Sequence, residues 1–311
     1  MQIAAAANET LAGFSNLLMY SAMAVYTLSF LAHCAEWVFG SRSRIAVQSA
    51  ALVAEERAAK AAAPAVTVKV AGKDGTTATL ERPAVVTRDT PGRPSVEGPG
   101  AAGEDDQADL LGRIAVSLGT LALLLHLASV VARGISVERP PWGNMYEFST
   151  AFAVVAMGVY LALLALGKPV RWLGLPVVTA VLLTLGLAVT VLYTESDQLV
   201  PALRSYWLWI HVSTAIVSGA ALYLGAVSTV LYLFKDRFEL ALAAGRTGGR
   251  LATVWRRLPS AASLDKFAYR INAVIFPLWT FAIIAGAIWA EAAWGRYWGW
   301  DPKETWSFIT W

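Results

Sequence analysis

Six stretches of this chain are each long and apolar enough to cross a lipid bilayer, and this constrains the fold more than any other feature of the sequence. A transmembrane helix needs about 20 mainly apolar residues. The apolar runs extend approximately over Leu11–Phe39, Leu111–Val131, Phe148–Leu166, Trp172–Tyr193, Trp207–Phe234 and Ala273–Ala290. Within hydrocarbon such segments must satisfy their own backbone hydrogen bonds, which favours helices. We therefore predict an all-α polytopic membrane protein with six full transmembrane helices.

The composition agrees with a membrane protein. Hydrophobic residues make up 57% of the chain and charged residues only 15%, and the mean hydropathy is +0.52. These values exclude an ordinary soluble globular protein. Cys34 is the only cysteine, which excludes an intrachain disulfide and a cysteine-based metal site. The N-terminus lacks a basic segment, so we expect no cleaved signal peptide.

A long polar stretch separates the first span from the second. It is rich in Pro, Gly, Thr and Glu, as in ERPAVVTRDTPGRPSVEGPGAAGEDDQ, and such a composition buries too little apolar surface to offset its ordering entropy. We predict three regions: a first transmembrane helix at 1–39, a cytoplasmic disordered linker at 40–109, and a membrane core at 110–311. The final residues, TWSFITW, resemble the start of a seventh span, so we expect the chain to be a truncated version of a longer one.

The distribution of basic residues predicts the orientation. Cytoplasmic loops carry an excess of Lys and Arg. Three segments carry this excess, and they fall on one side of a six-span protein: the linker start, the short loop with Lys168 and Arg171, and the segment after span five with Lys235, Arg237, Arg246, Arg250, Arg256, Arg257, Lys266 and Arg270. We therefore expect the N-terminus and the tryptophan-rich segment at 289–306 to lie outside the cytoplasm, with the plasma membrane as the location.

Three histidines lie in or near the spans, where ionisable groups are costly and often functional. His211 stands at the outer start of span five. It is either an interfacial residue or a ligand, since imidazole is a common ligand of haem iron. His126 lies inside span two, as a ligand or as a donor to a carbonyl of a neighbouring helix. His33 lies near the inner end of span one, where we expect a structural or interfacial role.

The segment WGRYWGWDPKETW concentrates indole rings in one short loop. Six of the thirteen tryptophans fall between Trp289 and Trp311. One interpretation is an aromatic belt at the membrane interface, and the other is a platform for a large planar ligand with polar edges. The spacing of Trp294 and Trp298 predicts one face of a short helix. Asp301 and Pro302 are typical of an N-cap followed by the first position of the next helix, which places Lys303 and Glu304 in its first turn.

A second polar motif, RPPWGNMYEFSTAF, precedes span three. Asn144 is predicted to be the N-cap of that span. By itself, this motif is typical of an ordinary entry from a loop into a helix.

The two motifs together resemble a known family. GNMYEF and WGRYWGWDPKETWSFITW are similar to the CcsA/ResC branch (called CcsB in actinobacteria) of the haem-handling WWD proteins, which is the membrane subunit of the system II cytochrome c synthase. The resemblance covers roughly residues 110–311, the first span also fits the family's layout, and the linker does not belong to the shared core. A full-length member has about eight transmembrane helices, each of about 20 residues.

The resemblance implies haem b as the bound substrate and an extracytoplasmic WWD segment as its platform. The positions that match the platform are Trp294, Gly295, Trp298, Trp300, Asp301, Pro302, Lys303, Glu304 and Trp306. The family has an external histidine one span before this segment, and His211 falls there, as an axial ligand of the haem iron. Two further family histidines lie downstream and are not in this chain. His126 matches no family ligand securely and stays a candidate.

The implied function is cytochrome c biogenesis, as a subunit of a holocytochrome c synthase complex that presents haem for thioether attachment to the CXXCH motif of apocytochrome c. The implied partners are a ResB-like membrane subunit, apocytochrome c and a thioredoxin-like thiol reductant, with no nucleic acid. Two alternatives remain open at this point. One is a WWD-type haem exporter or haem-chaperone loader, and the other is a non-haem transporter whose tryptophan loop only anchors it at the interface.

Overall fold

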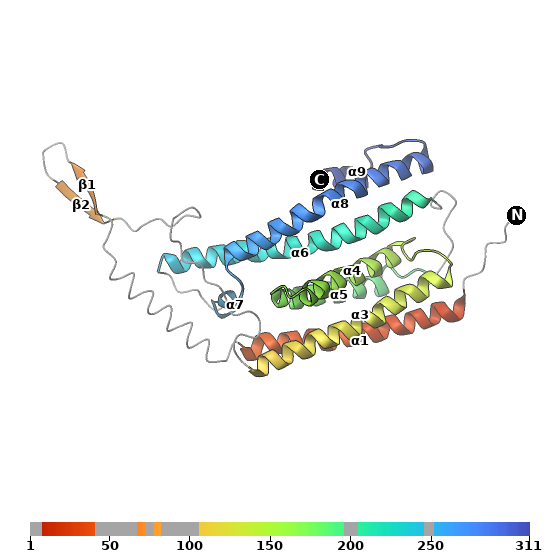
Figure 1. Ribbon diagram of the computed structural model, residues 1–311, viewed down its shortest axis with the longest axis horizontal. Helices are drawn as coiled ribbons and strands as arrows, with labels where there is room; N and C mark the ends of the chain where they lie inside the picture. Colours follow the sequence, from red (N-terminus) through yellow and green to blue (C-terminus); the bar gives the residue numbers. More distant parts are fainter. Residues whose placement is uncertain (1–7, 41–66, 72–76, 82–105, 196–204, 246–251) are drawn as a thin grey trace.

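The computed structural model describes residues 8–40, 67–71, 77–81, 106–195, 205–245 and 252–311, and shows an α-helical bundle (Figure 1). Within these residues, six helical segments are long and apolar enough to cross a membrane. Their bounds are α1 Glu9–Gly40, α3 Asp106–Ser136, α4 Met145–Ala165, α5 Gly174–Thr190 with the preceding 3₁₀ turn η1 Arg171–Leu173, α6 Tyr206–Ala243 and α8 Ala261–Trp294. The prediction of an all-α polytopic membrane protein is therefore confirmed.

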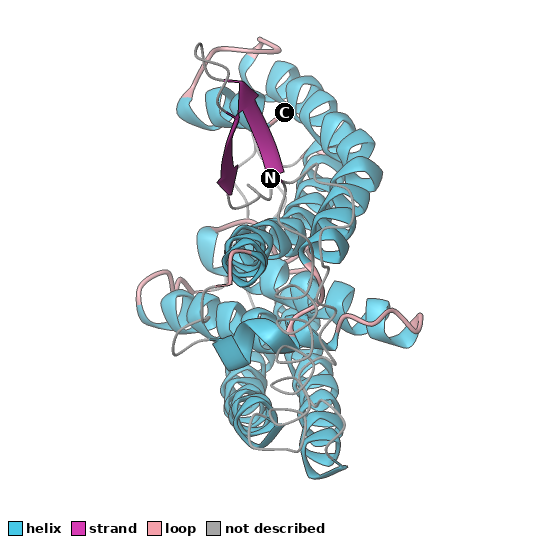
Figure 2. Ribbon diagram, turned by 90° about the vertical axis from the view of Figure 1, so that its left-hand side faces the viewer, coloured by secondary structure: helices cyan, strands magenta, loops and turns pink. Residues whose placement is uncertain are grey.

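The six helices are arranged as three pairs. The pair α1/α3 and the pair α6/α8 lie on opposite sides of the pair α4/α5 (Figures 1 and 2). Helix α4 packs on α6, and α5 packs on α1. The central pair therefore joins the two outer ones.

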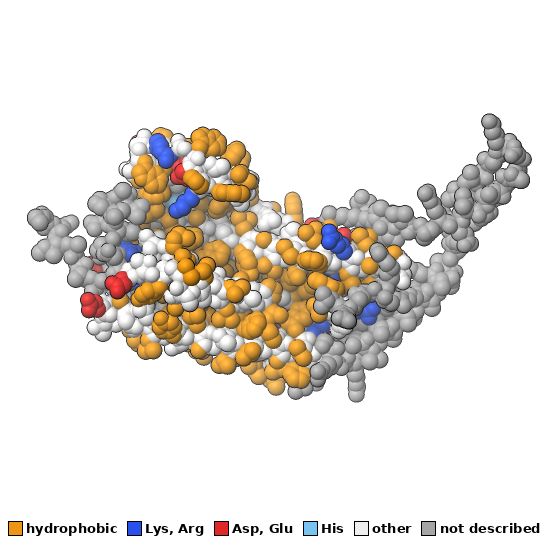
Figure 3. All heavy atoms as spheres, turned by 180° about the vertical axis from the view of Figure 1, so that it is seen from behind, with side chains coloured by type: hydrophobic (Ala, Val, Ile, Leu, Met, Phe, Trp, Pro, Cys, Tyr) orange, Lys and Arg blue, Asp and Glu red, His pale blue; other side chains and the backbone are white. Residues whose placement is uncertain are grey.

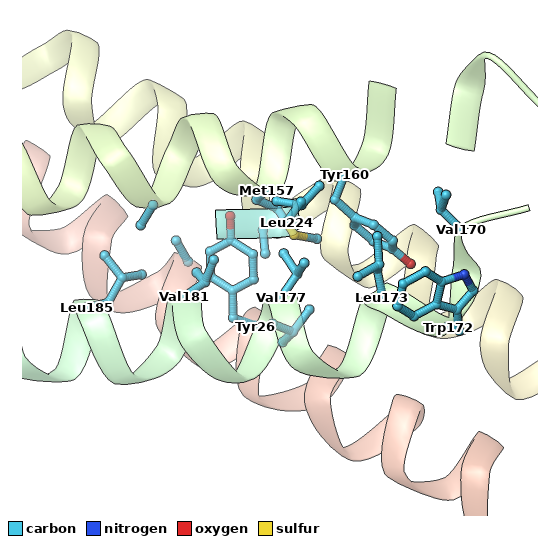
Figure 4. Close-up of a cluster of buried hydrophobic side chains, with 14 of the residues drawn as sticks. Tyr26, Met157, Tyr160, Val170, Trp172, Leu173, Val177, Val181, Leu185 and Leu224 are labelled. Carbon is cyan, nitrogen blue, oxygen red and sulfur yellow. The ribbon is translucent and has the colours of Figure 1, made fainter. Parts of the chain in front are cut away.

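The apolar core lies where the central pair meets α1 and α6. Figure 4 shows Tyr26 of α1, Met157 of α4, Val177 of α5 and Leu224 of α6 converging in this cluster, and all four are fully buried. Membrane helices associate through close packing of side chains, because lipid tails are as apolar as the helices. This cluster therefore fixes the relative positions of the helices.

The bundle has two distinct ends. One end of the bundle holds the loop that joins α3 to α4, the residues that directly follow α5, the starts of α1 and α6, and the end of α8 (Figure 1). The Asn8 amide donates to the Ser136 carbonyl at 2.9 Å, and Asn16 Nδ2 donates to Tyr193 Oη at 2.9 Å. The described parts of the segments predicted to lie outside the cytoplasm therefore lie at one end of the bundle, which we call the tryptophan end.

The opposite end, the basic end, is more helical than the sequence indicated. The basic segment after span five was predicted as a loop, but Lys235 and Arg237 lie on α6, and α7 (Ala252–Arg257) precedes α8. Lys235 is buried, and its Nζ donates to the carbonyls of Trp255 and Leu258 at 2.7 and 3.1 Å. This ammonium group therefore ties the segment before α8 to α6.

Two short strands lie within the predicted linker. β1 (Thr67–Ala71) and β2 (Thr77–Glu81) pair as an antiparallel hairpin, with Thr67 opposite Glu81. This hairpin corrects the prediction of a linker without regular structure over these residues. Both strands contain several β-branched residues, Thr67, Val68 and Val70 in β1 and Thr77 and Thr79 in β2, and such residues favour extended backbone. Gly40 ends α1 and residues 106–109 begin α3, so both ends of the predicted linker are helical; its remaining residues, apart from the hairpin, lie outside the described residues.

The described surface matches a bilayer environment. In Figure 3 the coloured charged side chains gather toward the two ends of the molecule, and the middle is covered by apolar side chains and backbone. Large apolar residues such as Leu183 and Val274 are 70% and 79% exposed. Such exposure in the middle of long helices is expected of a surface that faces lipid.

Candidate functional site

The tryptophan-rich segment is a turn between two helices. Helix α8 ends at Trp294, and Gly295 follows in the left-handed region with φ of 69°. Glycine adopts this conformation without a steric penalty and is the usual residue just beyond a helix end. Trp298 therefore lies in a loop and not on a helix with Trp294, so the prediction that the two share one helical face is wrong.

A capping box starts the next helix, α9 (Pro302–Thr310). The Glu304 amide donates to Asp301 Oδ1 at 2.9 Å, and the Asp301 amide donates to Glu304 Oε2 at 3.3 Å. Pro302 follows the N-cap, where its missing N–H costs nothing. The predicted cap, and the placement of Lys303 and Glu304 in the first turn, are therefore confirmed.

Glu304 also closes the loop that carries the tryptophans. Its Oε2 accepts a hydrogen bond from the Gly299 amide at 2.6 Å, and its Oε1 lies 3.3 Å from Arg296 Nη1. One carboxylate thus holds three points of the segment between α8 and α9. These contacts tie the loop to the first turn of α9.

The aromatic side chains of this loop are open to the outside of the molecule. Trp294, Trp300 and Trp306 are between 51% and 67% exposed. Trp300 has a φ of 57°, a left-handed conformation that costs roughly 1–2 kcal/mol for a residue with a Cβ. Its ring packs edge-on against Trp298 at 5.7 Å and against Phe308 at 5.9 Å. Strain of this kind often accompanies a functional site.

Helix α9 turns back along α8. Trp311 Nε1 donates to Thr280 Oγ1 at 2.9 Å, and the Trp311 ring stacks on Phe276 at 5.9 Å. Both partners lie on α8, well before its end at Trp294. After the loop, the chain therefore runs back alongside α8.

His211 lies on α6, and contacts with α8 fix its ring. The Nδ1 atom of His211 is 2.8 Å from the Ala282 carbonyl oxygen, which accepts the Nδ1 proton and so selects the tautomer with a free Nε2. No hydrogen-bond partner of Nε2 lies among the residues that the structure describes. The half-buried imidazole therefore keeps one nitrogen lone pair available to an electrophile or a metal.

Trp289 connects this imidazole to the tryptophan-rich loop. The rings of His211 and Trp289 are stacked, with centroids 6.1 Å apart and an interplanar angle of 12°. Trp289 in turn packs edge-on against Trp294 at 4.7 Å. The structure thus brings His211 close to Trp294, the first residue of the predicted platform, although the two are 83 positions apart in the sequence.

The other two histidines lie elsewhere. His126 is fully buried between α3 and α1, edge-on to Tyr26 at 5.9 Å, and neither of its ring nitrogens has a hydrogen-bond partner among the described residues. The expected bond to a carbonyl of a neighbouring helix is therefore not formed. His33 lies at the basic end, with its Nδ1 3.1 Å from Glu36 Oε2. Glu36 Oε1 lies 2.7 Å from Arg171 Nε, so this cluster ties α1 to η1.

Residues of the GNMYEF motif connect the loops of the tryptophan end through hydrogen bonds and ion pairs. Asn144 is the N-cap of α4, and its side chain accepts from the Glu147 amide at 2.9 Å, as predicted. The Glu147 carboxylate is buried and lies 2.7 Å from Arg139 and 3.2 Å from Arg133. Arg133 also donates to the Thr194 carbonyl. The carboxylate therefore joins the end of α3, the following loop and the residues after α5.

Three residues of this site lie on α8: Ala282 and Gly286, which sequence reasoning missed, and Trp289, which it gave only as the start of the tryptophan-rich segment. Their spacing of four and then three positions puts them on one face of α8, opposite His211. The spacing indicated that the three residues share one face of a helix, but nothing in the sequence indicated which other helix this face of α8 contacts. Glu147 lies within the quoted GNMYEF motif, but its two arginine partners were also missed.

These features define a polytopic α-helical membrane protein with a fixed imidazole and an exposed aromatic loop at one end. The chain belongs to the cytochrome c assembly protein family, whose model matches residues 142–311, more than half of the chain.

Among its relatives, the cytochrome c biogenesis protein CcsA of Gloeobacter violaceus is 32% identical over 247 residues, covering 65% of this chain and 73% of that protein. The CcsA of Synechocystis sp. is 32% identical over 237 residues, covering 61% and 71%. The CcsA of Synechococcus elongatus is 32% identical over 227 residues, covering 61% and 70%. The function of the chain therefore lies in cytochrome c biogenesis.

Proposed function

We propose that the protein binds haem b at the tryptophan end and presents it for covalent attachment to the CXXCH motif of apocytochrome c. The observation that carries this proposal is the His211 imidazole, held by the Ala282 carbonyl with its Nε2 free and stacked on Trp289. Imidazole with a hydrogen-bonded Nδ1 is a strong ligand of haem iron. The exposed indoles beside it offer flat apolar surface and N–H donors.

The residues present fit a haem substrate. The indole rings of Trp294, Trp300 and Trp306 are exposed, and the end of α8 lies at the same end of the bundle as the start of α6, which carries His211 (Figure 1). A macrocycle needs such an open apolar face. Haem itself supplies two vinyl groups, to which the thiols of apocytochrome c add. The contribution of this chain is to bind and orient the macrocycle, a positioning role that lowers the entropic part of the barrier.

The remaining platform positions shape the loop. Gly295 ends α8, and Asp301, Pro302 and Glu304 start α9 and hold the backbone. Lys303 is exposed in the first turn of α9, where its ammonium group suits a carboxylate such as a haem propionate. Trp298 is half-buried behind Trp300 and supports it.

His126 is the second residue that we propose as an iron ligand. Neither nitrogen of this buried imidazole has a hydrogen-bond partner among the described residues, and burying unsatisfied polar groups is costly. It lies on a different helix pair from His211, so it would serve a separate binding event within the membrane.

The partners that we propose follow from the family resemblance. They are a ResB-like membrane subunit, apocytochrome c and a thioredoxin-like protein that keeps the CXXCH thiols reduced. We propose that the complex acts in the plasma membrane, with the tryptophan end outside the cytoplasm. Relatives that are named for cytochrome c biogenesis favour this reading over a transporter with an interfacial anchor.

The test is haem content, measured by pyridine haemochrome and visible spectrum, in the full-length protein purified with its ResB-like partner. We expect His211→Gly to lose haem or change its spectrum, and added imidazole to restore it. His126→Gln, prepared in parallel, tests the second ligand. A wild-type complex without haem after reducing preparation would contradict the proposal, and haem that is unaffected by His211→Gly would remove His211 from it.

A further inference from the structure

Gly286 lies where α8 passes closest to the imidazole of His211. A Cβ placed on Gly286 would lie 2.7 Å from both Cε1 and Nδ1 of the ring, and 3.4 Å from Cγ. Real Cβ contacts are essentially never shorter than 3.0 Å. The absence of a side chain at this position is therefore what allows the ring to lie against the α8 backbone.

The same backbone provides the partner of the ring. The Ala282 carbonyl, one helical turn before Gly286, accepts the proton of His211 Nδ1 at 2.8 Å. Trp289, one turn after Gly286, stacks on the ring with an interplanar angle of 12°. Three residues over two turns of α8 thus set the tautomer, the depth and the plane of the imidazole.

We propose that Gly286 is the positioning residue for the iron ligand, a role that rests on the function proposed above for His211. Any side chain at 286 forces the ring away from α8 and breaks its bond to the Ala282 carbonyl. The ring then leaves its stack with Trp289. As a result, Nε2 moves away from the position in which it would bind the haem iron beside the tryptophan-rich loop. Gly286 contacts the imidazole and not the haem, so it acts through His211.

A matched control exists on the same helix pair. Gly225 of α6 also faces α8, and a Cβ there would lie 2.6 Å from Asn272 Oδ1. It is 14 positions from His211, or about 21 Å along the helix axis. Gly225→Ala therefore disturbs the same interface with the same gain in helix propensity, but does not displace the imidazole.

The first measurement uses the full-length protein with its ResB-like partner and compares wild type, Gly286→Ala and Gly225→Ala. We expect haem in Gly286→Ala to fall at least severalfold or to show a changed visible spectrum, and added imidazole to restore the wild-type spectrum. Gly225→Ala is expected to keep the wild-type spectrum without imidazole. A spectrum of Gly286→Ala that equals wild type, in a complex whose haem depends on His211, would overturn the proposal and leave the proposed function intact.

The second measurement does not need haem. Diethyl pyrocarbonate modifies unprotonated, accessible imidazole nitrogens, and peptide mass spectrometry separates His211 from the buried His33 and His126. Because Nδ1 is bonded to the Ala282 carbonyl, we expect a single adduct at His211 in wild type and in Gly225→Ala. In Gly286→Ala, the released Nδ1 allows a double adduct.

The two measurements separate the two hypotheses. A single adduct in Gly286→Ala shows that the ring has not moved and overturns the positioning role. A double adduct, together with a wild-type complex that carries no haem, overturns the proposed function but supports Gly286 as the residue that places the imidazole.

Discussion

Asp301 and Glu304 hold each other's backbone in a reciprocal pair. The side chain of Asp301 accepts from the amide of Glu304, and the side chain of Glu304 accepts from the amide of Asp301. Glu304 Oε2 accepts a second hydrogen bond, from the Gly299 amide at 2.6 Å. The loop that presents the indoles is therefore shaped by one carboxylate, whose loss is expected to loosen it.

The first prediction concerns this carboxylate. Glu304→Ala removes the acceptor of two backbone amides and is expected to destabilise the protein by about 1 kcal/mol, the usual cost of a lost cap. Glu304→Gln keeps an amide oxygen in the same place and is expected to retain most of the stability and most of the haem. Thermal unfolding followed by tryptophan fluorescence measures the stability of both variants, and pyridine haemochrome measures their haem content. Equal losses in both variants would show that charge, and not the acceptor geometry, holds the loop.

The second prediction concerns Trp300, the tryptophan with a positive φ. Trp300→Ala and Trp300→Gly both remove the indole, so both are expected to lower haem retention to the same degree. Only the glycine variant relieves the left-handed strain, roughly 1–2 kcal/mol, so it is expected to unfold at the higher temperature. Haem assays measure the loss of haem retention, and thermal scans measure the difference in unfolding temperature. An alanine variant as stable as the glycine variant would show that the backbone at position 300 is not strained.

The third prediction concerns the buried Glu147. Glu147→Gln leaves the guanidinium groups of Arg133 and Arg139 without the carboxylate that they share. Removing one partner of a buried ion pair typically costs about 3–5 kcal/mol, so we expect a large loss of folded protein in size-exclusion chromatography. Glu138→Gln, at the nearby exposed carboxylate, is the control and should behave as wild type. A stable Glu147→Gln protein would show that this carboxylate is not needed to hold the loops together.

The fourth prediction concerns orientation. In a Cys34→Ser background, Tyr297→Cys at the tryptophan end and Lys168→Cys at the basic end place single thiols at exposed positions. An impermeant maleimide is expected to label Tyr297→Cys in intact cells, and Lys168→Cys only after permeabilisation, because basic loops stay in the cytoplasm. The reverse pattern would invert the topology and place the aromatic loop on the cytoplasmic side.

The spans and the caps were predictable because they depend on local physics. A run of about 20 apolar residues predicts a membrane helix whatever its neighbours are. Asn144 and Asp301 cap helices through hydrogen bonds to amides three positions away. Both kinds of signal act within a few residues along the chain, so one sequence is enough to detect them.

Predictions failed where a boundary depends on distant contacts or on one backbone angle. Helix α8 begins at Ala261, 12 positions before the predicted span at Ala273, because its start is tied to α6 through Glu239 Oε1, which accepts from the Ala261 amide at 3.1 Å. Trp298 was placed on a helix with Trp294, but the left-handed Gly295 ends the helix between them. Periodicity does not reveal either effect.

By itself, the sequence determined the class of protein, the number and approximate positions of the spans, and the residues that cap α4 and α9. Apolar length and cap chemistry are properties of short segments, and they need no partner. Only the tertiary structure decided that His211 meets Ala282, Gly286 and Trp289, and that Glu147 meets Arg133 and Arg139. Membrane helices present similar apolar surfaces to one another, so the choice of partner depends on side-chain packing and on the few buried polar groups that must find each other.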